Sequence, residues 1–280
     1  MLFIPKIQGC IFINKGHSSQ ISADYPNNLA YTATMRTFAA SKIIKKMKIL
    51  VINASANKER STTLKLTKTF LEGLGVKASD VEFVTTIGLN VNPCRACYAC
   101  WFKTAGKCVQ KDDAIEVMEK IRQADLVIWS IPLYAYGVPS HCKALMDRTV
   151  SFNSPLMYVD ADGVAHHYGY EEGTKKTVLI STAGLPNMKS NFDGLLFAMR
   201  HMYGKNISYI CCAEGSLFMS PNTESITAPY LAKVKQAGTE YKSAERISNE
   251  TQVYLDTPML PAEAFIKTVN GIFEGMMKKK

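Results

Sequence analysis

Four cysteines with reactive or metal-binding side chains are clustered within fifteen residues of the sequence. They are Cys94, Cys97, Cys100 and Cys108, with the spacing C-x2-C-x2-C-x7-C. Ligands two residues apart allow one short loop to wrap an iron–sulfur cubane. Zinc sites more often use two C-x-x-C pairs separated by a dozen or more residues. The spacing therefore favours a [4Fe–4S] cluster over zinc, with reduced thiols, a redox dithiol or a structural disulfide as the alternatives.

Composition indicates the surroundings in which these thiols work. The chain has 280 residues, of which 47% are hydrophobic, but its apolar runs are short. Crossing a bilayer takes roughly 20 consecutive apolar residues, so we expect no membrane span. The first residues also lack the pattern of a secretory signal. We expect a cytoplasmic protein, and a reducing compartment favours metal or redox chemistry over disulfides.

Charge is concentrated near the N-terminus. The net charge is +9, and residues 1–46 contain six basic residues against one acidic residue. The rest shows no basic stripe interleaved with aromatic residues, so we expect no nucleic-acid partner. Residues 1–46 also lack a sustained apolar period, which predicts a disordered N-terminal extension, with translation from Met47 as an alternative. The folded domain is expected over 47–280.

From Met47 onward, short apolar runs alternate with helical patterns. This alternation is typical of a parallel sheet covered on both faces, in one three-layer α/β domain. The predicted strands are 49–52, 81–87, 126–131, 177–182 and 207–212, and the predicted helices are 62–74, 113–123, 139–150, 191–203 and 226–247. The connection 151–175 contains "DADG" and predicts a hairpin. In such a sheet, ligands bind where the strands end.

The loop after the first strand predicts an anion site. Ser55, Asn57, Ser61 and Thr62 supply hydroxyl and amide donors beside the start of a helix, whose free N–H groups and dipole favour negative charge. Neither G-x-G-x-x-G nor a P-loop is present. The alternative is an ordinary helix cap.

The loops after the third and fourth strands predict a site for a flat ring. Pro132, Leu133, Tyr134 and Tyr136 place apolar and aromatic groups on a turn. Thr182 and Gly184 follow the next strand, where a glycine lets backbone approach a ligand closely. Asp147 and Arg148, at the end of the intervening helix, are interpreted as a local ion pair. No nucleophile with an attendant base is found, so we predict no catalytic residue.

Together these segments resemble the flavodoxin-like NAD(P)H-dependent FMN reductases, and within them the iron-sulfur flavoproteins. The resemblance rests on "MKILVINAS…ST", "PCRACYAC…C", "ADLVIWSIPLYAYGVPSHCKALMDR" and "ISTAGLPN". It implies a flavodoxin-like sandwich with a five-stranded parallel sheet of order 2-1-3-4-5, bound FMN and a homo-oligomer. By position, Ser55, Ser61 and Thr62 would hold the FMN phosphate, while Pro132, Leu133, Tyr134 and Tyr136 would face the ring and Thr182 and Gly184 line its other side. Members often have Gly-Ser-Pro at 54–56 and Asn at 61, which this chain lacks.

The resemblance implies an FMN-dependent oxidoreductase. Electrons would pass from NAD(P)H or reduced ferredoxin to a quinone, another flavin or another small acceptor, and the cofactor would carry the chemistry. Two alternatives stay open, namely an iron-sulfur flavoprotein that carries electrons without an organic substrate, and a noncatalytic protein of the same fold.

Overall fold

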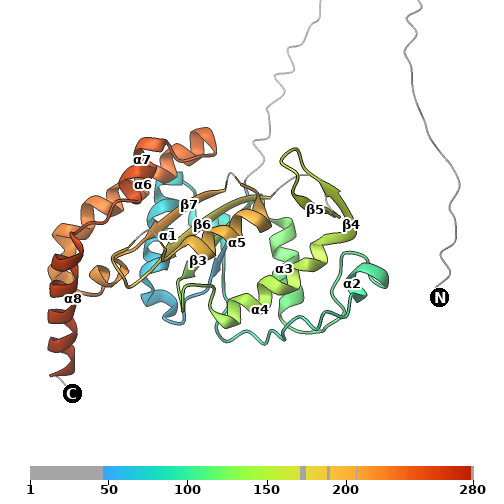
Figure 1. The fold of residues 1–280 in the computed structure, drawn as a ribbon, viewed down its shortest axis with the longest axis horizontal. Coiled ribbons are helices and arrows are strands. Elements are labelled where there is room, and N and C mark those ends of the chain that lie inside the picture. The colour runs from blue at the N-terminus through green and yellow to red at the C-terminus, as the bar shows by residue number, and fades with distance from the viewer. Residues whose placement is uncertain (1–46, 171–174, 188–189, 206, 279–280) are drawn as a thin grey trace, which may run out of the picture. The chain divides into compact units, whose positions relative to one another are not determined.

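The computed structural model describes residues 47–170, 175–187, 190–205 and 207–278, all within one compact unit of the chain. Residues 1–46, for which the sequence predicts a disordered extension, lie outside the described residues. In the described part, a central sheet is flanked by helices (Figure 1). The domain therefore has the predicted α/β architecture.

Five parallel strands form the central sheet. They are β1 (Ile49–Asn53), β2 (Val81–Thr85), β3 (Leu126–Pro132), β6 (Lys176–Thr182) and β7 (Ser208–Cys212), in the order β2-β1-β3-β6-β7. Because β4 and β5 form a separate hairpin, this order is 2-1-3-4-5 among the sheet strands, as predicted. β1, β3 and most of β6 are buried throughout, since helices cover both faces. β2 lies at the edge, and Val84 is its one buried residue.

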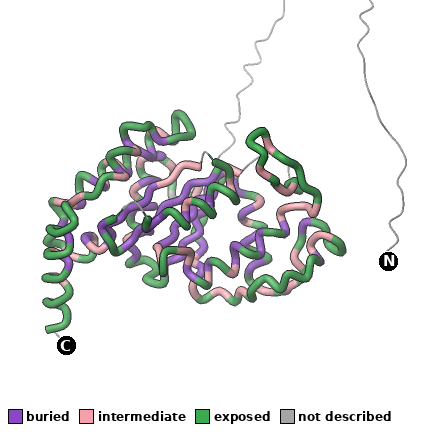
Figure 2. Tube along the Cα trace, in the orientation of Figure 1, coloured by how far each residue is buried: buried purple, intermediate pink, exposed green. Residues whose placement is uncertain are grey.

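Successive side chains of each strand point to opposite faces of the sheet and pack into two hydrophobic cores, one on each face. On one face, α1 (Thr62–Leu74) and α6 (Glu224–Ala244) cover residues such as Val51 and Ile128. On the other, α3 (Ala114–Gln123), α4 (Ser140–Arg148) and α5 (Asp193–Tyr203) cover the neighbouring positions, Ile52 and Trp129 among them. All five helices were predicted, and the sheet between them forms the buried centre in Figure 2.

The predicted hairpin is also present. β4 (Asn153–Val159) pairs antiparallel with β5 (Ala165–Gly169), and the turn between them is closed by Asp160, whose backbone N–H donates to the Val164 carbonyl at 2.9 Å. A short helix that was not predicted, α2 (Ala99–Phe102), lies within the cysteine segment. Its Trp101 ring packs on His167 of β5 at 5.2 Å between centroids. The hairpin and the cysteine segment are therefore in contact.

Two further helices follow α6, namely α7 (Asn249–Leu255) and α8 (Ala262–Met277), neither of which was predicted. The buried Glu214 carboxylate accepts hydrogen bonds from the backbone N–H groups of Met259 and Leu260, and so anchors the segment between them. The residues that the structure describes also contain five 3-10 helices, at Lys58–Arg60, Ala78–Asp80, Thr149–Phe152, Gly215–Met219 and Pro221–Thr223. Within the described ranges, no helix is long and apolar enough to span a membrane.

Candidate functional site

The loop after β1 turns directly into α1. The side chain of Ser61 caps this helix, since its Oγ accepts from the Leu64 N–H at 3.2 Å. Ser55 is buried, and its Oγ accepts from the N–H of Asn57 at 3.3 Å. The first N–H groups of a helix, here those starting at Thr62, have no intrahelical acceptor. The predicted anion site therefore lies at the N-terminus of a 13-residue helix. Asn57, also predicted for this site, is exposed to solvent.

The loop after β3 presents two aromatic rings on a tight turn. Tyr134 and Gly137 exchange backbone hydrogen bonds of 3.1 and 2.9 Å. Ala135 and Tyr136 between them have φ of 47° and 61°, the left-handed region, which costs roughly 1–2 kcal/mol per non-glycine residue. Tyr134 and Tyr136 are 43% and 59% exposed. A strained turn that holds two rings in solvent is a feature found at ligand sites.

The loop after β6 lies beside this turn. Thr182 is paired with Pro132 in the sheet, and its carbonyl accepts from the Leu133 N–H at 2.9 Å. Its hydroxyl lies 2.6 Å from the hydroxyl of Thr63 on α1, a residue that sequence reasoning missed. Gly184 follows at an exposed position. The sheet thus brings together the three predicted loops at one edge.

An unsatisfied donor is found just before α5, whose start lies beside the tyrosine turn, since a Cβ on Gly194 would be 3.7 Å from the Tyr136 carbonyl oxygen. Asn191, which precedes α5, is only 4% exposed, and its Nδ2 has no hydrogen-bond partner among the described residues. A buried amide without an acceptor is costly, and an acceptor on a ligand would satisfy it. A helix terminus with free N–H groups, two exposed rings and a buried donor without an acceptor fit FMN, which combines a phosphate, a flat ring and ring acceptors.

The four predicted metal ligands lie in a segment between β2 and α3. Cys94 and Cys97 are exposed, whereas Cys100 and Cys108 are partly buried. Burial raises the pKa of the Cys100 thiol, and negative charge on Cys108 raises it further. In donor type the four thiols fit a thiolate-bound metal centre. Within the described part of the chain, however, no three His, Cys, Asp or Glu side chains are gathered around a common metal position.

A buried ion pair closes the base of this loop. The guanidinium of Arg148 forms a two-pronged contact with Asp112, at 2.8 and 3.1 Å, and both side chains are 0% exposed. Against the cost of burial, the hydrogen bonds from Arg148 hold the pKa of Asp112 below its usual value. The predicted Asp147–Arg148 pair is wrong, since Asp147 pairs instead with Lys143 on the surface. Adjacent helix residues point about 100° apart, which separates the two partners.

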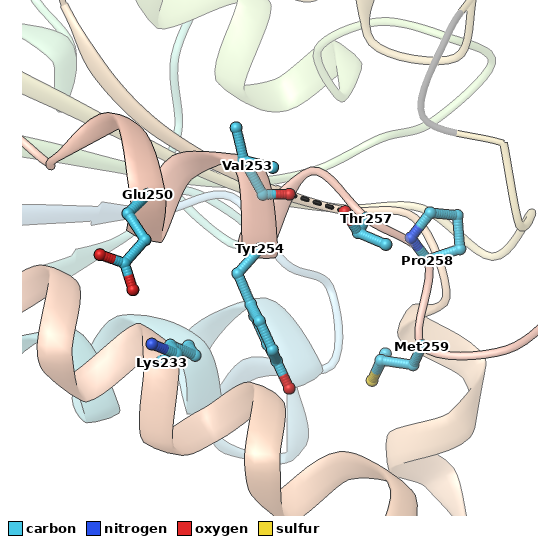
Figure 3. Close-up of a pocket in the computed structure, with 7 residues that line it drawn as sticks. All are labelled: Lys233, Glu250, Val253, Tyr254, Thr257, Pro258 and Met259. Carbon is cyan, nitrogen blue, oxygen red and sulfur yellow. Dashed lines mark hydrogen bonds between the residues drawn. The ribbon is translucent and has the colours of Figure 1, made fainter.

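One hollow lies away from these loops, between α6 and α7 (Figure 3). It measures about 390 Å³ and includes none of the predicted site residues. Its lining residues are Lys233, Glu250, Val253, Tyr254, Thr257, Pro258 and Met259. Two of its lining residues contact each other, since the Lys233 ammonium lies 5.4 Å from the centre of the Tyr254 ring.

The sheet order and the ligand edge define an α/β protein of the doubly wound class, with its site at the carboxyl ends of the strands. Residues 47–207 match the family model described as the flavodoxin-like fold. This match spans more than half of the chain, and the chain belongs to that family.

Curated relatives have narrower names. An iron-sulfur flavoprotein of Methanocaldococcus jannaschii is 36% identical over 103 residues, which are 37% of this chain and 52% of that protein. An FMN-dependent NADH:quinone oxidoreductase of Hydrogenovibrio crunogenus is 25% identical over 122 residues, 44% of this chain and 57% of that protein. The chain thus spans about half the length of the curated relatives it matches.

Among solved structures, an azoreductase from Bacillus anthracis superposes with a TM-score of 0.51 at 15% identity. The superposition covers 69% of this chain and 99% of that one. At this identity the similarity supports the fold alone, and it agrees with the family match.

Proposed function

We propose that this chain binds FMN at the carboxyl edge of its sheet and transfers electrons from NAD(P)H to a quinone, another flavin or another small acceptor. The observation that carries the proposal is the meeting of three loops at that edge, with a helix terminus, a turn bearing two tyrosines and a buried free amide donor. The names of the relatives, which include FMN-dependent NADH:quinone oxidoreductase, support the choice of cofactor and donor.

In this proposal, bound FMN supplies the electron exchange, and the protein supplies binding and orientation. The α1 terminus with Ser55, Ser61 and Thr62 holds the phosphate, because free N–H groups and the helix dipole favour an anion there. The turn at Tyr134 and Tyr136 lies against the ring. Reduced ferredoxin as an alternative donor, a homo-oligomer and a cytoplasmic location remain parts of the proposal.

The test begins with the purified protein incubated with FMN and freed of excess by gel filtration. We expect one FMN per chain, and we expect anaerobic NADH or NADPH to bleach it rapidly, with electrons then accepted by a soluble quinone. Protein that retains no flavin would contradict the cofactor assignment and favour a noncatalytic role. Bound flavin that no nicotinamide reduces would contradict the donor assignment.

A second candidate is an electron carrier that combines FMN with a metal cluster on Cys94, Cys97, Cys100 and Cys108. It is favoured by the cationic hydrogen bond that reaches one of these sulfurs, described below, and by the iron-sulfur flavoprotein names of several relatives. Anaerobic reconstitution with iron and sulfide should load close to four irons per chain if a [4Fe–4S] cluster forms. Reduction of such protein by ferredoxin, with no reduction by nicotinamides, would favour the carrier.

A further inference from the structure

One buried side chain contacts the cysteine loop at both of its ends. Arg148 Nη1 donates to the carbonyl of Asn92 at 2.9 Å, just before the first cysteine, and Nη2 lies 3.4 Å from the carbonyl of Gln110, just after the last. Asp112, which pairs with the same guanidinium, also accepts from the Asn92 backbone N–H at 3.0 Å. Arg148 therefore closes the loop at its base.

The remaining donor of Arg148 points at a cysteine. Its Nε lies 3.1 Å from the Sγ of Cys108. The guanidinium then has an acceptor for all five of its N–H groups. A neutral thiol is a weak acceptor, whereas a metal-bound thiolate carries negative charge and accepts strongly from a cation.

We propose that Arg148 is a positioning residue for the metal centre. It holds the Cys108 sulfur in place as the first ligand, and the other three cysteines then complete the coordination of the metal. The proposal rests on the metal-binding role suggested for the four cysteines. Cys94 and Cys97 are exposed, whereas Cys108 is partly buried and its sulfur accepts a hydrogen bond from Arg148. Groups that orient metal ligands in this way are needed for affinity, and hydrogen bonds to cluster sulfurs set the reduction potential.

Cobalt(II) is the probe for the first measurement, because thiolate ligation gives it a strong charge-transfer absorption. Anaerobic, reduced, FMN-loaded protein is titrated with Co²⁺, as wild type, Arg148→Lys and Arg148→Met. Loss of a ligand-orienting partner typically weakens metal binding by about 10- to 100-fold, and we expect that loss in both variants, larger in Arg148→Met. The sulfur-to-cobalt band should also move to lower energy, since a sulfur without its hydrogen bond gives up charge more easily.

A matched control is available on the same loop. Arg122 also donates to it, and its acceptor there is a backbone oxygen, the carbonyl of Gly106. Arg122→Met should therefore leave the energy of the cobalt band unchanged. Because Arg148→Met leaves the buried Asp112 charge unpaired, the double variant Arg148→Gln/Asp112→Asn serves as a second test. It removes both charges, and bound FMN and thermal melting report whether it folds.

The second measurement uses protein reconstituted with iron and sulfide. The potential of the cluster, followed by electron paramagnetic resonance, should be more negative in the Arg148 variants than in the wild type and in Arg122→Met, because a positive donor at the sulfur favours the reduced centre.

Unchanged cobalt affinity in the Arg148 variants would overturn the positioning role. Weaker binding with an unmoved band and potential would overturn it too, because Arg148 would then only hold the loop together. Wild-type protein that retains FMN but binds neither cobalt nor a cluster would overturn both this inference and the cluster candidate, while the FMN proposal would stand.

Discussion

The contact between α1 and α6 depends on two glycines. A Cβ placed on Gly73 would lie 1.8 Å from the Lys235 carbonyl oxygen, and one on Gly238 would lie 2.1 Å from that of Phe70. Both obstructing atoms belong to the backbone, so neither can rotate away. The two helices therefore touch along their backbones, and Gly238→Ala is expected to force them about 1 Å apart.

The size of the effect follows from two opposing terms. Overpacking costs typically about 1–3 kcal/mol, and a backbone obstacle puts this case at the upper end. Replacing a helical glycine by alanine returns about 1 kcal/mol. The net loss in the free energy of unfolding is then about 2 kcal/mol, which lowers Tm by about 4–8 °C in a domain of this size.

Thermal melting of FMN-free protein, followed by circular dichroism, measures this change. Gly271→Ala in α8 is the matched control, since a Cβ there meets nothing within 4 Å and the propensity gain should raise Tm slightly. Gly73→Ala should behave like Gly238→Ala. If both variants melt at or above the wild-type temperature while Gly271→Ala also rises, the close approach of the two helices is refuted.

Three further predictions concern the site and its supports. Ser55→Ala with Thr62→Ala should weaken FMN binding about tenfold or more, measured by flavin fluorescence, with Tm of the free protein nearly unchanged; unaltered affinity would remove the phosphate assignment. Asp112→Asn should lower the free energy of unfolding, measured by urea titration, by about 3 kcal/mol, because it breaks a buried ion pair. Asp147→Asn breaks an exposed ion pair and should change the same quantity by less than about 1 kcal/mol. Burial raises the pKa of Glu214, so its contribution to stability is present below about pH 4.3 and is lost as pH rises through the folded pKa; urea unfolding of Glu214→Gln should lack that pH dependence.

The sequence predicted the parts of the fold that depend on local patterns. Strand and helix periods located the five sheet strands and five of the helices, and the "DADG" turn located the hairpin. The helices α7 and α8 were not predicted, because the sequence analysis assigned no element after residue 247. Their packing depends on Glu214, whose carboxylate anchors a segment 45 residues further along.

The candidate site was predictable wherever one loop carried its own signal. Cysteine spacing and the polar loop after the first strand were of this kind. The roles of Thr63, Asn191 and Arg148 could not be predicted. They depend on contacts with residues far away in the sequence, or on a missing contact, and these are known only from the folded structure. Thr63 meets Thr182 across 119 positions, and Arg148 meets Asp112 across 36.

Helix α4 relates the two proposed centres to each other. At its start, His141 Nε2 lies 3.0 Å from the carbonyl oxygen of Ala54, in the loop assigned to the FMN phosphate. At its end, Arg148 holds the cysteine loop. Seven residues of helix rise by about 10 Å, so one rigid element sets the spacing between these two contacts. Because Cys142 and Leu145 between them are fully buried in the core, α4 cannot shift at one end without disturbing the other. In the proposed arrangement, α4 therefore keeps the phosphate loop and the cysteine loop at a fixed separation.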